Sequence, residues 1–558
     1  MTNRWAKAIA AGLIAMLALS GCAEIPRSSV VKQGPDIRSL LSNDYLYYSP
    51  SGPLAGEAEA DILSGFLNAS TGPQNDYSVA RQYLTAGFKA RWSPNDAVYI
   101  QNGSQKTTIG TDGSASVAIG VAATVDSLGH YQALRAGATR VLKFHLTKVA
   151  GQWRISSAPN AVVMIRPVFD VIFHSYPVYF FDHSYNYLVP DLRWFPARAS
   201  TATRLVAAIL AGASPWLADA VVPAMPAGTK LSIDSVPVEK KTAIVNLDAS
   251  AAKASRLARQ RFKAQLQATV GGVNNISKVA VFIDGVPQSI SDFSPSSTST
   301  GAYAPIVLGA NGLEQLTGPS GGRVGNASGW IKKLQASDFA VSSDETGAAI
   351  VGPTGVYLGR LDQESKDPVL VDSRKSLLSP RFDRRGQLWL LGTDGALHIV
   401  LPTGKSLWPT LGITAGHSIR AFAVSAEGAR IAYVVRDKDG TERLRVAAVI
   451  RDQLGTVTGF GKPVELAYGV GKPASLAWSG KTGLLVLSTV SASVSNLTLL
   501  TLGGDPREIG TLDRALNLMA SDDGTNIYVL DANRQLREYR GYTWMTINQD
   551  VVAAHMVN

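Results

Sequence analysis

Cysteine is almost missing from this sequence, which has one such residue, Cys22, among 558. A single cysteine excludes an intramolecular disulfide and every zinc or iron–sulfur site built from several cysteines. The seven histidines are scattered along the chain, and no HExxH pair occurs among them. We therefore expect no metal site and no cofactor, and we assign no catalytic residue.

Charge is sparse as well, because charged residues make up 17% of the chain, against about 25% in ordinary soluble domains. The 53 Lys and Arg residues exceed the 43 Asp and Glu residues, which gives a net charge of +10. No long basic run occurs, so a nucleic-acid partner is not expected. Hydrophobic residues reach 46% and glycines number 52, which favours turn-rich β structure with several separate cores.

Long apolar runs are limited to the N-terminus. Residues 8–19 are almost entirely apolar and follow the basic Arg4 and Lys7, a pattern typical of a secretory signal. This run is too short to cross the hydrocarbon core of a bilayer comfortably. It ends in Leu-Ser-Gly-Cys at residues 19–22, which resembles the lipobox of bacterial lipoproteins.

The lipobox resemblance implies cleavage between Gly21 and Cys22. It also implies an S-diacylglycerol group and an N-acyl chain such as palmitate on Cys22, the predicted lipidation site. We therefore expect a signal peptide at residues 1–21, a tether at 22–38, and a mature protein anchored to the outer face of the cell membrane.

Residues 39–165 predict an α+β domain. Apolar spacing indicates helices at 57–69 and 77–88, the second with Asp76 as its N-cap. Strand-like runs follow at 97–100, 116–125, 141–149 and 153–156, and the last two are joined by a hairpin. Two helices before a curved antiparallel sheet are similar to the cone-like, nuclear-transport-factor-like fold.

Residues 175–300 predict a second α+β domain. Pro-x-Gly-Thr-x-Leu at 226–231 and Val-x-Leu-Asp at 245–248 resemble the GerM-type domain of spore-germination proteins. Helices are expected at 201–210 and 251–269, with Asp248 as a helix N-cap and not a catalytic acid. His174 and His183 flank an aromatic strand and are interpreted as residues of the domain junction.

The segment 301–330 is rich in Ser, Gly and Thr and is interpreted as a linker with a short strand near 304–309. Residues 331–558 repeat a turn followed by an apolar strand about every 40 residues, which is typical of an all-β propeller. The turns lie at 343–347, 382–386, 424–428, 478–483 and 521–524. Five repeats are clear, and the linker strand with the tail after 542 could complete a sixth. We therefore expect five or six blades.

The acidic residues of these repeats suit turn chemistry, notably Asp344, Asp383 and Asp522. Asp437 to Gly440 is similar to the start of a calcium loop but lacks the remaining ligands, so a charged hairpin turn is expected. No ligand-binding residue can be assigned from these patterns. The sequence thus favours a binding protein over an enzyme.

The domain order, together with three local sequences, resembles the LpqB lipoprotein family of high-GC Gram-positive bacteria. These sequences are Asp-Ile-Leu-Ser-Gly-Phe-Leu-Asn-Ala at 61–69, Ala-Arg-Gln-Tyr-Leu at 80–84 and Trp-Ser-Pro at 92–94. The resemblance implies an accessory of the MtrA–MtrB two-component system, which binds the extracytoplasmic part of the sensor histidine kinase. Cell-wall homeostasis and division would respond. Only Cys22 carries over as a defined functional residue.

A second interpretation stays open. The propeller could be a glycan-binding or hydrolytic module that acts on the cell wall, and the kinase interpretation also leaves room for a cell-wall ligand. A propeller enzyme would gather acidic and aromatic side chains in its central funnel. A binding scaffold would present a broad face with scattered charge.

Overall fold

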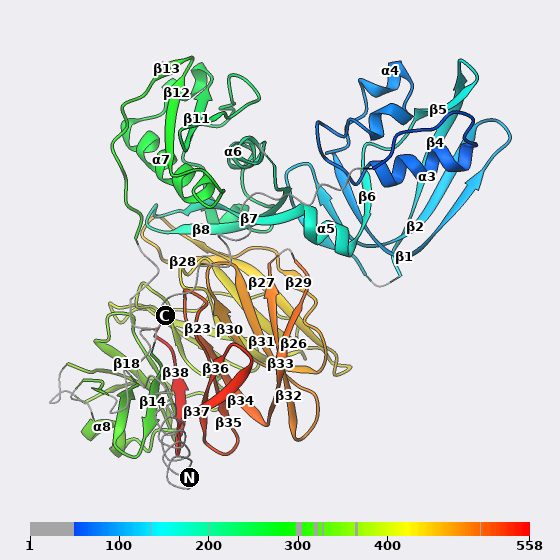
Figure 1. Cartoon of the computed structure of the whole chain (residues 1–558). Coiled ribbons are helices and arrows are strands. Elements are labelled where there is room, and N and C mark those ends of the chain that lie inside the picture. The colour runs from blue at the N-terminus through cyan, green and yellow to red at the C-terminus, as the bar shows by residue number, and fades with distance from the viewer. Residues whose placement is uncertain are drawn as a thin grey trace, which may run out of the picture. The chain divides into compact units, whose positions relative to one another are not determined.

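The structure is a computed structural model that describes residues 50–135, 137–198, 200–296, 304–316, 322–325, 328–362, 367–502 and 504–557. Along these residues an α+β region is followed by a second α+β region and then by an all-β region (Figure 1). The expected signal peptide and tether, with Gly21 and Cys22, lie outside the described residues. No helix in the described part of the chain is long and apolar enough to cross a membrane.

The first region is a sheet in the order β5-β4-β2-β1-β6, with β3 paired to β2. Its strands are β1 (Ala97–Ile109), β2 (Ser114–Asp126), β3 (Tyr131–Ala133), β4 (Thr139–Val149), β5 (Gln152–Ser157) and β6 (Val162–Ile165). Alternate residues of β2 are buried, so Val117, Ile119 and Val121 face the core. The same core holds Phe66 of helix α3 (Glu59–Ala69), as the apolar spacing of that segment predicted.

The expected helix at 77–88 is wrong. The segment forms turns, a 3-10 helix (Ala80–Tyr83) and the one-turn helix α4 (Ala86–Lys89). Asp76 and Tyr77 have φ of 54° and 57°, which an α-helix cannot accommodate. Asp76 therefore does not cap a helix, and it pairs instead with Arg81, 2.7 Å away. Burial of the Tyr77 ring against Trp92 accounts for this departure from local helical preference.

The predicted hairpin before residue 153 is present. Strands β4 and β5 pair antiparallel, and the turn between them places Ala150 at φ 49° and Gly151 at φ 79°. Two successive positive φ values match the right-handed twist of a two-residue hairpin. Helix α5 (Arg166–Ile172) then leads directly into the second region.

The second region contains two small sheets with two helices between them. Their order is β8-β7-β9 and β10-β11-β12-β13. The elements are β7 (Phe173–Asp182), β8 (Leu188–Pro196), α6 (Thr201–Ala211), a 3-10 helix (Ala218–Ala220), β9 (Val221–Val222), β10 (Val238–Glu239), β11 (Thr242–Leu247), a 3-10 helix (Ala249–Lys253), α7 (Arg256–Val270), β12 (Lys278–Ile283) and β13 (Val286–Pro287). Strands β11 and β12 are parallel, so α7 is the crossover between them.

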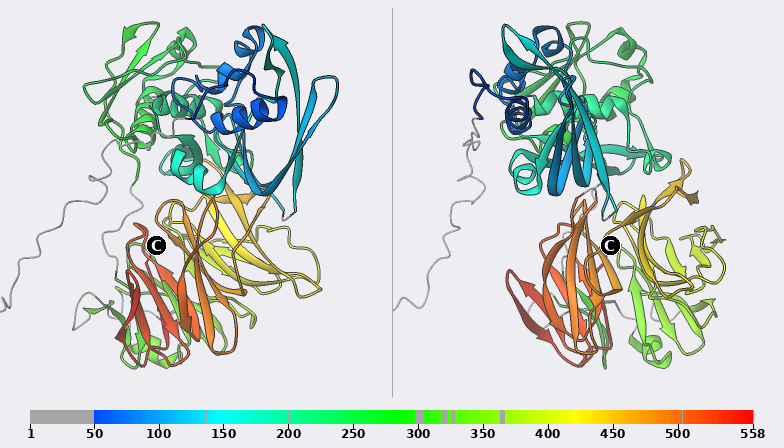
Figure 2. Two further views of the ribbon diagram at one scale, coloured as in Figure 1. Left: turned by 45° about the vertical axis from the view of Figure 1, so that its right-hand side comes forward. Right: turned by 90° about the vertical axis from the view of Figure 1, so that its right-hand side faces the viewer.

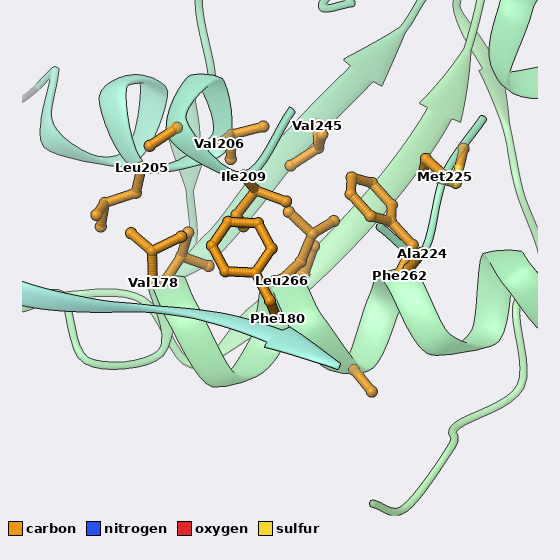
Figure 3. Packing of buried hydrophobic residues seen from close by; sticks show 14 of the residues in the cluster. Val178, Phe180, Leu205, Val206, Ile209, Ala224, Met225, Val245, Phe262 and Leu266 are labelled. Carbon is orange, nitrogen blue, oxygen red and sulfur yellow. The ribbon is translucent and has the colours of Figure 1, made fainter. Parts of the chain in front are cut away.

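The second helix of this region begins later than expected from residue 251. Ala254 is extended, with φ −67° and ψ 135°, and this separates the 3-10 helix from α7. The Ser255 hydroxyl then caps α7 by accepting a hydrogen bond from the Ala258 amide at 3.1 Å. Figure 3 shows how Leu266 of α7 and Ile209 of α6 meet Phe180 of β7 in the shared core.

The all-β region consists of six successive antiparallel sheets, shown in two further views in Figure 2. The first is β14 (Ile306–Gly309), β15 (Gly312–Gln315), β16 (Gly322–Arg323) and β38 (Ala553–His555), followed by helix α8 (Ser328–Lys333). The second and third are β17 (Asp338–Val341), β18 (Gly347–Gly352), β19 (Gly355–Arg360), β20 (Val369–Asp372), and β21 (Arg381–Phe382), β22 (Leu388–Leu391), β23 (Leu397–Val400), β24 (Ser406–Leu407).

The remaining sheets have the same plan. They are β25 (Ser418–Val424), β26 (Arg430–Arg436), β27 (Glu442–Arg451), β28 (Val457–Phe460) with β29 (Val464–Leu466); β30 (Lys472–Ser479), β31 (Gly483–Thr489), β32 (Val494–Thr501), β33 (Arg507–Asp513); and β34 (Ala515–Ala520), β35 (Ile527–Asp531), β36 (Leu536–Arg540), β37 (Thr543–Asn548). Second strands such as β22 are buried on both faces. Sheet therefore packs on sheet, as in a propeller.

The short strand expected near 304–309 is present as β14, and it pairs with the tail of the chain, as the sequence suggested. The described part of 301–330 is not only a linker, however, because it contains three strands of the first sheet. Strand β14 pairs antiparallel with β38, so that Ile306 faces His555 across the ladder. The last strand of the chain thus completes the sheet that opens the region. The weak sequence signal has a physical reason, because β14 and β15 have only four residues each.

Candidate functional site

A cavity of about 270 Å³ lies among the first strands of the propeller sheets. Strands β17, β21, β25, β30, β34 and β38 each form the edge of their sheet and contribute to its lining. Its polar lining residues are Ser337, Asp338, Ser379, Arg381, Arg420, Ser475 and Asn517. Edge strands also leave backbone N–H and C=O groups free of the ladder, so the wall is polar in its main chain too.

His555 lies beside the larger cavity, where it contacts the lining residues Asp338 and Arg381, and it lines the smaller neighbouring cavity itself. Its Nε2 lies 2.7 Å from Asp338 Oδ1, and its Nδ1 lies 2.8 Å from Arg381 Nη1. Because a guanidinium can only donate, Nδ1 accepts and Nε2 carries the hydrogen that it donates to Asp338. Burial lowers the pKa of His555, which agrees with a neutral ring. Since both nitrogens are engaged, His555 has none free to act as a general base.

Asp338 already accepts hydrogen bonds within the protein. Besides the bond from His555, its Oδ1 accepts one from the Phe339 amide at 2.8 Å. Burial acts to raise the pKa of Asp338, but the contacts with His555 and Ser379 and the charge of Arg381 outweigh it and lower the pKa to about 2. The carboxylate is therefore ionised, and its charge is satisfied inside the protein.

Arg381 differs from Asp338 in this respect. Its Nη1 group donates both of its hydrogen bonds, one to His555 and one to the Pro380 carbonyl oxygen at 3.2 Å. Nε and Nη2 have no acceptor within the described residues. Arg381 also lines a second, smaller cavity of about 40 Å³, which includes Trp478 and Asp522. Arg381 thus lines both cavities, and its Nε and Nη2 groups are available to donate hydrogen bonds.

The larger cavity opens at the beginning of the first strands. Ser337, Ala474 and Leu516 line it and are exposed, and Leu516 is 60% exposed. The Arg420 side chain is 43% exposed, and its Nε is 3.9 Å from the nearest Glu442 carboxylate oxygen. Arg420 is therefore loosely paired at the mouth, and Arg381 lies deeper.

At the opposite end of these strands, an ion pair joins the propeller to the second region. Asp182, the last residue of β7, lies 2.7 Å from Arg385, with the two side chains 2% and 12% exposed. The Arg385 guanidinium also lies over the Tyr187 ring, 4.8 Å from its centroid. Ala429 and Ala448 of the propeller belong to the same buried cluster as the core of the second region.

A polar contact also joins the first region to the propeller. Asp505 accepts a hydrogen bond from the Tyr131 hydroxyl at 2.5 Å and pairs with Arg166. Burial, followed by the bond to Asp505, raises the pKa of Tyr131. None of these contacts was visible in the sequence, because the partners lie hundreds of residues apart.

The acidic residues singled out from the sequence separate into two groups. Asp344 stabilises its own turn, as expected, because it accepts hydrogen bonds from the Ser342 hydroxyl at 2.5 Å and from the Thr346 amide at 3.1 Å. Asp522 does not, because it pairs with Arg384 of another sheet. The turn acid there is its neighbour Asp523, which accepts from the Thr525 amide at 3.0 Å.

The structure also places four other residues that the sequence singled out. Asp248 precedes a 3-10 helix, as an N-cap should, but makes no capping bond and accepts from the Ser250 hydroxyl instead. Asp437 begins a hairpin turn between β26 and β27 and pairs with Arg443 and His417, so the expected charged turn is present. His174 is exposed on β7, whereas His183 follows β7 with a buried Nδ1. Within the described residues, no cluster could hold a metal ion.

The cavity residues were missed because they are far apart in the chain. Asp338, Arg381, Arg420, Ser475 and Asn517 each precede the turn of their own repeat. Aligning the repeats on their turns would have placed them on equivalent strands. His555 lies outside that pattern, in the tail that the sequence suggested could complete a sixth blade, but nothing marked it as a site residue.

The chain has clear relatives. The family model described as "Lipoprotein LpqB, N-terminal domain" matches residues 52–170, "Sporulation and spore germination" matches 177–289, and "Lipoprotein LpqB beta-propeller domain" matches 314–555. A Lipoprotein LpqB of Bifidobacterium longum is 29% identical over 464 residues, covering 80% of this chain and 79% of the relative. Another from Cutibacterium acnes is 27% identical, covering 87% and 82%.

Solved structures add little. A putative TolB from Agrobacterium tumefaciens is 13% identical and covers 38% of this chain and 79% of its own, at a TM-score of 0.30. The sheets and the family matches together define a lipoprotein with a GerM-like domain and a C-terminal propeller. The chain belongs to the LpqB lipoprotein family.

Proposed function

We propose that this chain is a lipid-anchored protein of the outer face of the cell membrane that binds the extracytoplasmic part of an MtrB-like sensor kinase. Through that contact it modulates two-component signalling that controls cell-wall homeostasis and division. The observation that carries the proposal is the match to LpqB lipoproteins along most of the chain. Cleavage after Gly21 and acylation of Cys22 would supply the anchor.

The organisation of the described residues supports a binding role. The contacts of Asp182 with Arg385 and of Asp505 with Arg166 join both α+β regions to the propeller. Such a protein presents a defined surface to a partner. We propose that the first region has the cone-like, nuclear-transport-factor-like fold and that the six sheets form a six-bladed ring closed by β38.

We further propose that the protein acts without catalysis. Glycosidases commonly use two carboxyl groups held roughly 5–9.5 Å apart. Among the described residues lining the larger cavity, Asp338 is the single carboxylate, and its Oδ1 already accepts two hydrogen bonds. This favours signalling over the alternative of a hydrolytic propeller acting on the wall.

Cross-linking in intact cells tests the proposal. A tagged full-length protein is cross-linked on the outer face of the membrane, and captured proteins are identified by mass spectrometry. We expect capture of a sensor histidine kinase, and weaker capture by a Cys22→Ala variant that lacks the acylation site. Capture of wall polymer or wall-synthesis enzymes without a kinase would contradict the proposal.

A further inference from the structure

We propose that the larger propeller cavity binds a small organic anion, whose acid group is held by Arg381 and Arg420. The ligand class is a hydroxylated carboxylate or phosphate about the size of one monosaccharide, such as a sugar acid or a sugar phosphate. This inference goes beyond the proposed function and does not depend on the kinase.

The charges of the lining favour an anion. Arg381 and Arg420 are its cations and Asp338 its carboxylate, among the described residues, while His555 beside them is neutral. The two arginines therefore leave a net positive charge. Asp338 offers little to a cationic ligand, because His555, Ser379 and the Phe339 amide already engage it.

The hydrogen-bond pattern of Arg381 also favours an anionic ligand. Arg381 uses Nη1 to hold His555, which fixes the plane of the guanidinium and leaves Nε and Nη2 for a ligand. A planar guanidinium with adjacent free donors matches the oxygens of a carboxylate or phosphate. Asp338, acting through His555, is thus a positioning residue for Arg381.

The neighbouring wall provides groups for hydroxyl recognition. Asn517 Oδ1 accepts bonds from the Ser475 hydroxyl at 3.2 Å and the Leu518 amide at 3.0 Å, and its Nδ2 donates one bond to the Ala554 carbonyl at 3.0 Å. The second Nδ2 hydrogen remains available for a ligand oxygen. Phe422 and Leu476 are among the residues that add apolar surface to the lining.

Size and access are consistent with this ligand class. The cavity of about 270 Å³ is slightly below the roughly 300–1,000 Å³ of common ligand pockets. That volume suits a single sugar or amino-acid-sized molecule and is too small for a glycan chain. Arg420 at the mouth attracts an anion before Arg381 receives it, and the attraction falls with added salt.

The test is calorimetric titration of the full-length chain in detergent with four probes. These are glucuronate, glucose 1-phosphate, inorganic phosphate and neutral glucose. We expect one of the two organic anions to bind with a stoichiometry of one and glucose to give no saturable heat. Inorganic phosphate separates recognition of a free ion from recognition of the whole molecule.

Three variants link binding to the site. Arg420→Gln at the exposed mouth should weaken the anion about tenfold, and Arg381→Lys, which keeps the charge but loses the fork of donors, should weaken it at least as much. Arg507→Gln, an exposed arginine on the outer strand β33, removes the same charge elsewhere and should leave affinity within about twofold.

Several outcomes overturn the proposal. These are no binding of either organic anion, equal binding of glucose, or equal affinity in the Arg420→Gln and Arg507→Gln variants. Stronger binding of inorganic phosphate than of both organic anions also overturns it. Because Arg420 is exposed, its variant stays informative even where Arg381→Lys fails to fold. Kinase capture is measured separately, so failure of either proposal can be recognised independently.

Discussion

Asp383 and Arg451 form an ion pair inside the propeller, with 2.7 Å between Oδ2 and Nη2 and side chains 0% and 2% exposed. Asp383 follows β21, and Arg451 ends β27, so the pair ties neighbouring sheets together. Asp383 also accepts a bond from the Trp389 indole at 3.2 Å. Asp383 also shapes its turn, as expected, because its Oδ1 accepts the Arg385 and Gln387 amides, each at 3.0 Å. The same side chain therefore links two neighbouring sheets.

Removing one partner of this pair should be costly. We expect Asp383→Ala to lower the free energy of unfolding of the propeller by about 3–5 kcal/mol, because Arg451 is left buried and unpaired. Hydrogen exchange of β22 and β27 would report the loss. Asp362→Ala removes the exposed carboxylate that pairs with Arg360 and should change little. Equal protection in both variants would contradict the ion-pair interpretation.

The contact between Asp182 and Arg385 predicts coupled unfolding of the GerM-like domain and the propeller. Arg385→Gln should leave both domains folded but split one thermal transition into two, because the pair is nearly buried. Differential scanning calorimetry measures this directly. The Arg507→Gln protein should unfold like the parent. A single unshifted transition for Arg385→Gln would show that the apolar contacts alone couple the domains.

Asp522 predicts an unusual pH dependence. Burial, opposed by Arg384, raises the pKa of Asp522 to about 6, so the folded protein binds this proton more readily than the unfolded chain. Wild-type stability should therefore rise relative to Asp522→Asn, by on the order of 2 kcal/mol, as pH falls from about 6 to about 4. Denaturant unfolding at several pH values measures the difference.

Asp523 is the matched control. Its hydrogen bonds with Ser521 and Thr525 lower its pKa despite some burial, so its contribution has the opposite sign. Relative to Asp523→Asn, the wild-type protein should lose stability as pH falls below about 4. Parallel pH profiles for the two variants would argue against the raised pKa of Asp522.

Alanine substitutions at two glycines of the first region can distinguish the cost of backbone strain from the cost of steric overlap. Gly103 and Gly113 have nearly the same φ, 80° and 81°. A Cβ added at Gly113 would lie 2.4 Å from the Leu146 carbonyl oxygen, whereas a Cβ added at Gly103 would have no atom within 4 Å. Gly103→Ala should cost about 1 kcal/mol. Gly113→Ala should cost above about 3 kcal/mol. Exchange protection of β4 would distinguish them, and equal losses would exclude overlap as the cause.

Local patterns predicted much of the fold. A strand-like run at 116–125 predicted β2, apolar spacing predicted α3 and α6, and the repeated turns predicted the propeller strands. Predictions failed where distant contacts override local preference. The buried ring of Tyr77 prevents a helix, and the extended Ala254 splits another.

The candidate site was much harder to predict. Arg381 has no sequence motif, and its meaning depends on His555 and Asp338, which approach it only when the sheets are assembled. These side-chain contacts depend on which strands lie next to one another in the folded protein. A single sequence shows which residues are present but not which of them come into contact in the fold.

Strand β38 has a consequence for how the protein is made. It pairs with β14 across almost the whole propeller sequence, and it brings His555 to Asp338 and Arg381. Synthesis proceeds from the N-terminus, so the sheet of β14 lacks this partner strand until residues 553–555 have been made. Deletion of residues 553–557 would therefore remove the partners that His555 provides to Asp338 and Arg381, and it would leave the edge of β14 unpaired and exposed to proteases and to other nascent chains.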